Sequence, residues 1–145
     1  MPAVRRSPLL VAFWKVHRFL YRVSGGRIGT KMGPGRQLLL TTTGRRSGQP
    51  RSVALTFLEE DGSWIVVATN AGEDVHPAWW LNLVADPRAE VQVGTKRRRV
   101  RANEIEEPER SNLYRRFVDE IDRGYAEYSD RTDRRIPVVA LTPED

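Results

Sequence analysis

From residue 37 onward, apolar residues recur with a period of two in short segments separated by tight turns, and no other feature constrains the fold as strongly. This alternation is typical of strands that bury one face. Many short strands and few helices indicate an α+β domain, whose mainly antiparallel sheet of about six strands closes or nearly closes into a barrel. The expected strands cover residues 37–43, 51–58, 64–69, 89–93, 97–104 and 136–142.

Two short helices are predicted to cover this sheet, one opening at His76-Pro77 and one beginning after Pro108. Gly124 is placed to cap the end of the second helix. The strands do not alternate regularly with crossover helices, and no G-x-G-x-x-G motif follows a strand. This pattern argues against a parallel dinucleotide-binding fold.

The first 24 residues follow a helical period instead. A helix is expected to start at Ser7-Pro8, and apolar residues spaced by three or four continue to Val23. The other face is basic, so the helix could touch an anionic membrane, or it could pack on its own domain with that face in solvent. The apolar run within it is too short to span a bilayer. The basic residues are Lys15, Arg18 and Arg22.

The length of 145 residues fits one domain. Lys and Arg total 24 against 19 Asp and Glu, and this net charge of +5 favours anionic ligands such as phosphates. The absence of cysteine excludes disulfides, thiolate metal ligands and thiol nucleophiles, and suits a cytoplasmic location. His17 and His76 are too few and too far apart in sequence to suggest a metal site. We divide the domain into a helix (1–24), a glycine-rich linker (25–36) and the barrel (37–145).

A basic run over residues 96–101 could in principle bind nucleic acid. On a strand its members alternate between the two faces, and a solvated edge strand that discourages aggregation explains the run as well. We therefore expect no nucleic-acid partner.

The segment over residues 41–51, Thr-Thr-Thr-Gly-Arg-Arg-Ser-Gly-Gln-Pro-Arg, has the chemistry of a phosphate cradle. Gly44 and Gly48 bracket a turn whose backbone N–H groups are expected to be free, and guanidinium groups bind phosphate with two hydrogen bonds. The alternative is an ordinary hairpin turn with its arginines in solvent. The side chains that could take part are those of Thr41, Thr43, Arg45, Arg46, Ser47 and Arg51.

A second segment, residues 68–72, leaves a strand with small residues, which would let a planar ring approach the backbone. The helix that follows could direct N–H groups at a ring oxygen or a phosphate. Trp79, Asn82 and Leu83 share one face of that helix and could wall a flat heteroaromatic ring. The alternative is that the tryptophans, Trp80 above all, are core residues that anchor the helix to the barrel.

Taken in order, these motifs resemble the deazaflavin-dependent nitroreductases of actinobacteria. The likeness rests on residues 38–51, on 67–83 followed by Asp86-Pro87, on Tyr125 with Tyr128, and on 133–137. It implies a split β-barrel related to flavin-mononucleotide-binding proteins. It also implies an oxidoreductase that takes its hydride from reduced coenzyme F-420, a deazaflavin, and passes it to a quinone or a nitroaromatic acceptor.

The resemblance also implies roles for individual residues. The cradle would hold the phosphate and acidic tail of the cofactor, and the segment after the third strand would border its ring, facing the helix. One departure is that Thr69-Asn70-Ala71-Gly72 stands where the family often has Ser-Lys-Gly-Gly, so a cationic contact to the tail is missing. The implied cofactor-binding residues are Arg45, Arg46, Ser47 and Arg51 in the cradle, and Thr69, Asn70, Ala71, Gly72, Pro77, Trp79 and Asn82 around the ring.

In such an enzyme the protein mainly orients the reactants, and the oxygen that gains charge on the acceptor needs a hydrogen bond or a proton. Thr69, Tyr125 and Tyr128 are the implied donors. The tyrosines are expected in a loop that could form a lid over the ring, the alternative being two surface tyrosines that cover apolar area. Two other functions stay open: a split-barrel protein that binds flavin mononucleotide or haem, and a basic, non-enzymatic module that binds anions or nucleic acid.

Overall fold

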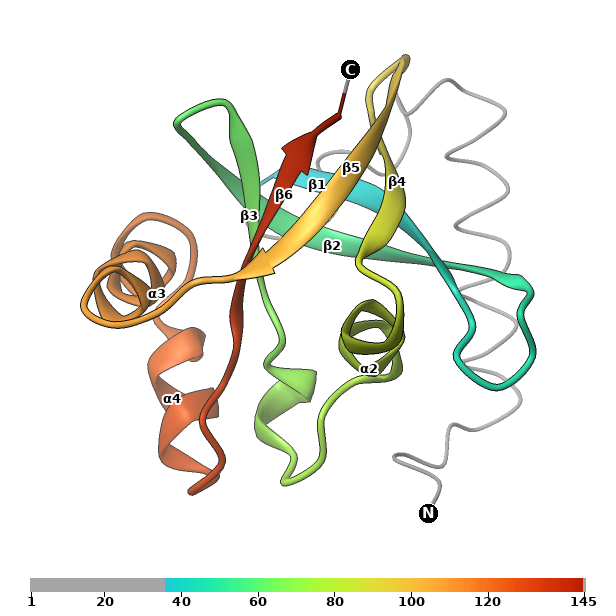
Figure 1. The fold of residues 1–145 in the computed structure, drawn as a ribbon. Helices are drawn as coiled ribbons and strands as arrows, with labels where there is room; N and C mark the ends of the chain where they lie inside the picture. Colours follow the sequence, from blue (N-terminus) through green and yellow to red (C-terminus); the bar gives the residue numbers. More distant parts are fainter. Residues whose placement is uncertain (1–35, 145) are drawn as a thin grey trace.

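The computed structural model describes residues 36–144, without the side chain of Ala71. The predicted helix over residues 1–24, and the linker up to residue 35, lie outside this range. Within it the strands form a closed antiparallel barrel in the order β1-β2-β3-β6-β5-β4 (Figure 1). The elements are β1 (Arg36–Thr43), β2 (Pro50–Glu60), β3 (Ser63–Val67), the 3-10 helix η1 (Asn70–Gly72), α2 (Ala78–Ala85), β4 (Arg88–Val93), β5 (Lys96–Glu104), α3 (Glu109–Glu120), α4 (Gly124–Asp130) and β6 (Val138–Pro143).

The six predicted strands and the α+β barrel are confirmed, with strand ends that differ by at most two residues. The β2–β3 turn places Asp61 and Gly62 at positive φ (50° and 79°), and Gly94 (φ 59°) turns β4 into β5. These are the conformations for which such turns select glycine and aspartate. The alternation of apolar residues was thus a sufficient signal for the sheet.

The segment after Ile121 corrects the prediction. Residues 124–130 form the helix α4, and Gly124 begins this helix instead of capping the previous one. The carboxylate of Asp122 accepts a hydrogen bond from the Gly124 N–H at 2.8 Å, and the Asp122 carbonyl accepts one from the Tyr125 N–H at 3.1 Å. These bonds satisfy amides that a helix start leaves without a partner.

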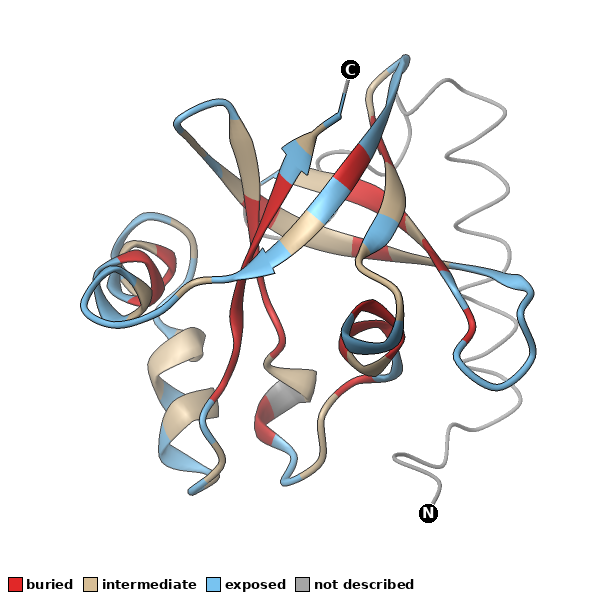
Figure 2. Ribbon diagram, viewed as in Figure 1, coloured by how far each residue is buried: buried red, intermediate tan, exposed pale blue. Residues whose placement is uncertain are grey.

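The alternation of side chains divides the apolar residues between the barrel interior and its outer surface. Val66 and Leu141, on the paired strands β3 and β6, point inward, while their neighbours Ile65 and Ala140 point outward. The buried face of α2 packs on the interior cluster, and α3 packs on the outer one (Figure 2). The interior cluster consists of Leu38, Leu40, Phe57, Val66, Ala68, Trp79, Trp80, Leu83, Val91, Val100, Val139 and Leu141.

The outer cluster joins three elements that matter for the site. Leu113, Tyr114 and Phe117 of α3 cover the outward residues of β3 and β6, and Tyr125 of α4 packs at the edge of this contact. The helix α4 in turn contacts η1. Among residues 36–144, no helix has the length and apolar character that crossing a membrane requires.

Candidate functional site

The turn between β1 and β2, residues 44–49, lies within the predicted phosphate cradle, and we call it the cradle turn. It is closed by its own hydrogen bonds. The Gly44 N–H donates to the Gln49 carbonyl and the Gly48 N–H to the Gly44 carbonyl, both at 2.8 Å, while the Gln49 N–H donates to Ser47 Oγ at 3.1 Å. The Arg45 N–H donates to Asn82 Oδ1 at 3.0 Å. The expectation of free backbone N–H groups is therefore wrong for four of the turn's amides, because closing so tight a turn uses them.

Gly44 and Gly48 allow the backbone of the cradle turn to adopt this closed conformation. A Cβ on Gly44 would lie 2.6 Å from Ser47 Oγ and 3.2 Å from the Gln49 carbonyl oxygen, so a larger residue would push the turn apart. Gly48 has φ +69°, a conformation that side chains disfavour. The turn is held in one shape, and what it presents to solvent is its side chains.

Those side chains carry the positive charge that the sequence predicts. Arg45, Arg46 and Arg51 are exposed, and Arg51 Nη2 donates to Ser47 Oγ at 3.4 Å. Thr43 is exposed at the end of β1, whereas the Thr41 hydroxyl hydrogen-bonds across the strand pair to the Ser52 hydroxyl at 2.8 Å. Arg45, Arg46 and Ser47 thus lie on the turn and Arg51 at the start of β2, with Thr41 bound to the neighbouring strand.

Asn82 connects this turn to α2. Its side chain is 5% exposed, and Nδ2 donates to Thr42 Oγ1 at 3.1 Å while Oδ1 accepts from the Arg45 amide. The Thr42 hydroxyl continues the chain of hydrogen bonds to the Arg51 carbonyl at 3.5 Å. Because both ends of the amide are engaged, Asn82 braces the cradle turn here and does not present a free amide to a ligand.

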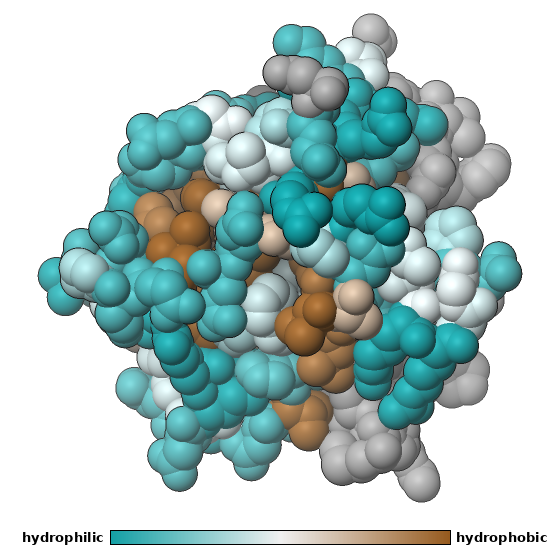
Figure 3. Space-filling model, in the orientation of Figure 1, coloured by the Kyte–Doolittle hydropathy of each residue, from teal (hydrophilic) through white to brown (hydrophobic). Residues whose placement is uncertain are grey.

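The other residues of this helix face are also mostly enclosed. Trp79 is 8% exposed and belongs to the barrel interior with Trp80, and Pro77 is buried at the helix start. The interpretation of the tryptophans as core anchors holds for both of them in this structure. Trp79 therefore offers little surface as a ring wall, because the barrel interior needs its apolar bulk. Only Val84 of the large apolar residues is strongly exposed among residues 36–144, and apolar surface shows over α2 in Figure 3.

The segment from Ala68 to His76, which we call the ring segment, leaves β3 and doubles back through η1. Asn70 has φ 47°, and its side chain donates from Nδ2 to the Val75 carbonyl at 3.0 Å. Gly72 has φ +79°, and a Cβ there would lie 3.1 Å from the Tyr128 carbonyl and from Arg131 Cδ. A small residue is needed here because α4 packs directly on the segment.

Thr69 stands at the start of η1 with a half-buried side chain. Its carbonyl accepts hydrogen bonds from the Gly72 N–H at 2.9 Å and from Arg134 Nη2 at 2.8 Å. Within residues 36–144 its hydroxyl has no hydrogen-bond partner and does not cap η1. The backbone carbonyl of Thr69 is held by both bonds, while its hydroxyl has no partner among the described residues.

Arg134 and His76 are residues to which sequence reasoning assigned no role. Arg134 follows α4 and reaches back to the ring segment, where it contacts His76 Nδ1 at 2.9 Å. Burial lowers the pKa of His76 below 6.5, the Arg134 charge lowers it further, and Glu104 opposes the change. The only signal for Arg134 was its place in the 133–137 motif, because the ring-segment partners of its side chain lie 58 to 66 residues away in sequence.

The two candidate tyrosines lie on α4 and not in a loop. The Tyr125 ring packs edge-on against Phe117 and Tyr128, with centroid distances of 5.3 and 5.6 Å, and its carbonyl accepts a hydrogen bond from the Tyr114 hydroxyl. Burial raises the pKa of the Tyr125 phenol, which a hydrogen bond with Thr56 opposes. The ring of Tyr128 is 6.0 Å from the Arg131 guanidinium. Tyr125 is thus part of a packed cluster, and only Tyr128 adjoins the ring segment through its backbone.

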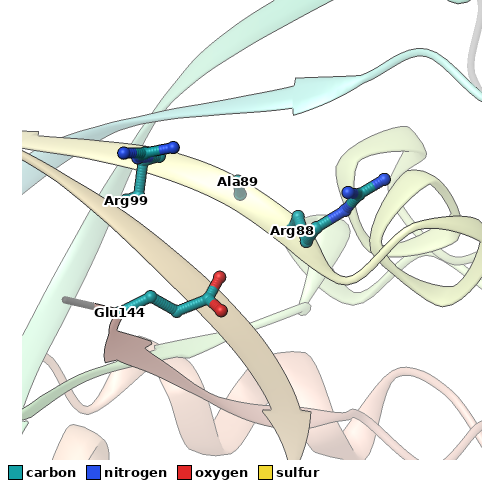
Figure 4. Close-up of a pocket in the computed structure, with 4 residues that line it drawn as sticks. All are labelled: Arg88, Ala89, Arg99 and Glu144. Carbon is teal, nitrogen blue, oxygen red and sulfur yellow. The ribbon is translucent and has the colours of Figure 1, made fainter.

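A separate hollow of about 260 Å³ lies between β4, β5 and the end of β6 (Figure 4). Its lining is Arg88, Ala89, Arg99 and Glu144, none of which belongs to the cradle turn or the ring segment. Arg88 is engaged by Asp86 at 3.2 Å. Across the described range, no three His, Asp or Glu residues are grouped so that they could hold a metal ion.

The protein family and the similar curated protein that match this chain carry the same description. Residues 13–143 match the family described as F420H(2)-dependent quinone reductase. The chain is 36% identical over 135 residues to an F420H(2)-dependent quinone reductase of Mycobacterium tuberculosis, a match that covers 91% of each chain.

Two solved structures are similar throughout the fold. One, described as a domain-swapped dimer, is 34% identical with a TM-score of 0.69, covering 93% of this chain and 99% of its own. The other, described as an F420-H2 dependent reductase, is 40% identical with a TM-score of 0.65, covering 72% of this chain and 92% of its own.

Proposed function

The chain belongs to the family of F420H(2)-dependent quinone reductases, and on that premise we propose that it transfers a hydride from reduced coenzyme F-420 to a quinone. The observation that carries the proposal is the 36% identity over 91% of the chain to a curated reductase. The site is proposed to run from the cradle turn, past the start of α2, to the ring segment. Pro77 and Asn82 are separated by five residues, or roughly 8 Å of helix rise, so α2 joins the two halves of this site.

The residues present fit such a cofactor. Arg45, Arg46 and Arg51 together with Ser47 are the donor set that a phosphodiester and an acidic tail require. At the other end, the Thr69 hydroxyl has no hydrogen-bond partner among the described residues and suits the polar edge of a flat ring. When bound, reduced coenzyme F-420 supplies the hydride, and the protein supplies orientation and hydrogen bonds.

The acceptor must be met by a proton donor, because a quinone oxygen gains negative charge as the quinone is reduced. We propose the hydroxyls of Thr69, Tyr125 and Tyr128 for this role. Burial raises the pKa of Tyr125 above its usual value of 10.0, so its phenol stays protonated throughout the neutral range, and it could donate to the acceptor in place of its hydrogen bond with Thr56. The Thr69 hydroxyl has no competing partner among the described residues.

The function is tested by titrating the purified protein with oxidised coenzyme F-420 and, in parallel, with flavin mononucleotide, following the quenching of cofactor fluorescence. The reduced complex is then mixed with a soluble quinone. We expect saturable binding of the deazaflavin and quinone-dependent reoxidation. Preference for flavin mononucleotide would favour the alternative flavin-binding function, and binding of neither cofactor would contradict both enzymatic proposals.

Replacing Tyr125 by phenylalanine is expected to lower turnover about 100-fold, the usual effect of losing a proton donor, with cofactor affinity unchanged. Steady-state kinetics and the fluorescence titration measure the two quantities separately. Tyr114→Phe is the matched control, because the Tyr114 hydroxyl is bound to the Tyr125 carbonyl and burial raises the Tyr114 pKa to about 12. Unchanged turnover in Tyr125→Phe would remove Tyr125 from the proposal and leave Thr69 and Tyr128.

The nitroaromatic acceptor and the membrane contact remain predictions from the sequence. A nitroaromatic compound as an alternative acceptor rests on the resemblance of the motifs. Peripheral contact with an anionic membrane rests on the basic helix face within residues 1–24, which lie outside the described range.

A further inference from the structure

The side chain of Arg134 binds the ring segment at four places. Its guanidinium donates to the carbonyls of Ala68 at 3.1 Å, Thr69 at 2.8 Å and Glu73 at 3.2 Å, and it contacts His76 Nδ1 at 2.9 Å. These four residues span the whole segment from the end of β3 to the residue before Pro77. The planar guanidinium of Arg134 therefore contacts both ends of the ring segment, which contains η1.

Arg134 is itself fixed by its neighbours. Its backbone N–H donates to the Thr132 hydroxyl at 3.1 Å, and that hydroxyl donates to the Asp74 carboxylate at 2.7 Å. Asp74 belongs to the ring segment. The chain around Arg134 is therefore connected to this segment both by the Arg134 guanidinium and by the Thr132 hydroxyl. A side chain whose backbone is held in place keeps its partners in position more firmly than one on a mobile backbone does.

The contact with His76 determines which ring nitrogen carries the proton. A guanidinium has five N–H donors and no acceptor, so His76 Nδ1 must be the acceptor and must be unprotonated. The neutral imidazole then carries its proton on Nε2. Protonation of the ring is opposed by burial and by Arg134, with Glu104 acting in the other direction. Among the described residues Nε2 has no hydrogen-bond partner, so its N–H is left for a ligand.

We propose that Arg134 is a positioning residue of this enzyme, which holds the ring segment in its binding shape and fixes His76 as an Nε2–H donor. The inference rests on the proposed function, because the ring segment is the part assigned to the cofactor ring and the acceptor. Arg134 acts through Thr69 and His76, whose backbone and imidazole it holds, and it need not touch the reactants itself.

Lysine could not replace it, since a single ammonium has the charge but not the planar fork that reaches three carbonyls and an imidazole together. This difference separates positioning from a simple need for positive charge. Arg135 offers a matched control on the same stretch of chain. Its side chain is about half exposed and, among the described residues, its guanidinium pairs with the exposed Glu106 at 3.5 Å.

The test compares Arg134→Lys, Arg134→Gln and Arg135→Gln with the wild-type protein. The readouts are coenzyme F-420 affinity by fluorescence, kcat and KM for a soluble quinone, thermal unfolding, and imidazole nitrogen NMR shifts without cofactor. The His76 signals are assigned by their loss in His76→Gln. A misplacement of about 1 Å reduces rates roughly 100-fold, so we expect Arg134→Lys to lose about 10- to 100-fold in kcat/KM while staying folded. Arg135→Gln should behave as the wild type.

The NMR experiment on the wild-type protein needs no cofactor, and the comparison with Arg134→Gln is made on variant protein that thermal unfolding shows to be folded. In the wild-type protein, we expect His76 to be protonated on Nε2 with Nδ1 as an acceptor. In Arg134→Gln its pKa should rise, because a nearby positive charge has been removed. A wild-type His76 protonated on Nδ1 would overturn the inference, as would an Arg134→Lys enzyme with unchanged kcat/KM or a loss of thermal stability alone. Failure of the wild type to bind coenzyme F-420 would instead reject the proposed function.

Discussion

Replacing Arg45 and Arg51 together by alanine is expected to weaken coenzyme F-420 binding by about 3 to 6 kcal/mol, or roughly a hundred- to ten-thousandfold. Charge-assisted hydrogen bonds contribute about 1.5 to 3 kcal/mol each, and Arg45 in the cradle turn and Arg51 at the start of β2 are exposed, with no carboxylate within ion-pair distance among the described residues. Fluorescence quenching measures the dissociation constant directly. Affinity in the wild type should also fall as salt is added, because the contact is ionic and exposed.

The control must remove the same charge elsewhere. Arg97 and Arg101 are exposed on β5, which pairs with β4 and β6 and not with β1 or β2. Arg97→Ala combined with Arg101→Ala should leave the affinity within a few-fold of the wild type. If both double variants lose affinity equally, general charge attraction binds the cofactor and the cradle assignment is wrong. If Arg45→Ala with Arg51→Ala binds normally, the phosphate is held elsewhere.

Asn82→Ala is expected to lower the free energy of unfolding by about 2 to 4 kcal/mol, because it leaves Thr42 and the Arg45 amide without their partner. Chemical denaturation measures the loss. Cofactor affinity should fall too, since the turn that displays Arg45 loses its brace. Thr42→Val removes only one of the two contacts and should lose less stability.

Asn112→Ala is the matched control for this prediction, because Asn112 is exposed on α3 and alanine is a good helix former. Its stability should stay within about 0.5 kcal/mol of the wild type. A different result would change the interpretation of Asn82. If Asn82→Ala unfolds like the wild type but no longer binds the cofactor, then Asn82 contacts the ligand and is not a brace.

Two local predictions failed for a shared reason. Tyr125 was expected in a loop because the stretch that contains it is polar. The helix forms because Asp122 satisfies its first amides and because Tyr125 packs on Phe117. Free amides were expected in the cradle turn because two glycines bracket it, but the turn closes on itself and on Asn82. The helix α4 and the closed cradle turn each depend on hydrogen bonds or contacts with particular residues, and a pattern in the sequence does not reveal these contacts.

The sequence by itself determined the barrel, its turns, the position of the cradle arginines and the family. Strand periodicity and glycine turns are local properties, and a family motif is read residue by residue. Only the tertiary structure decided which polar groups form hydrogen bonds within the protein. Asn82 is engaged by residues 37 and 40 positions away, and Arg134 by residues 58 to 66 positions away. The hydrogen-bond partner of a side chain is set by barrel closure and helix packing, which bring together residues whose separation in sequence carries no periodic signal.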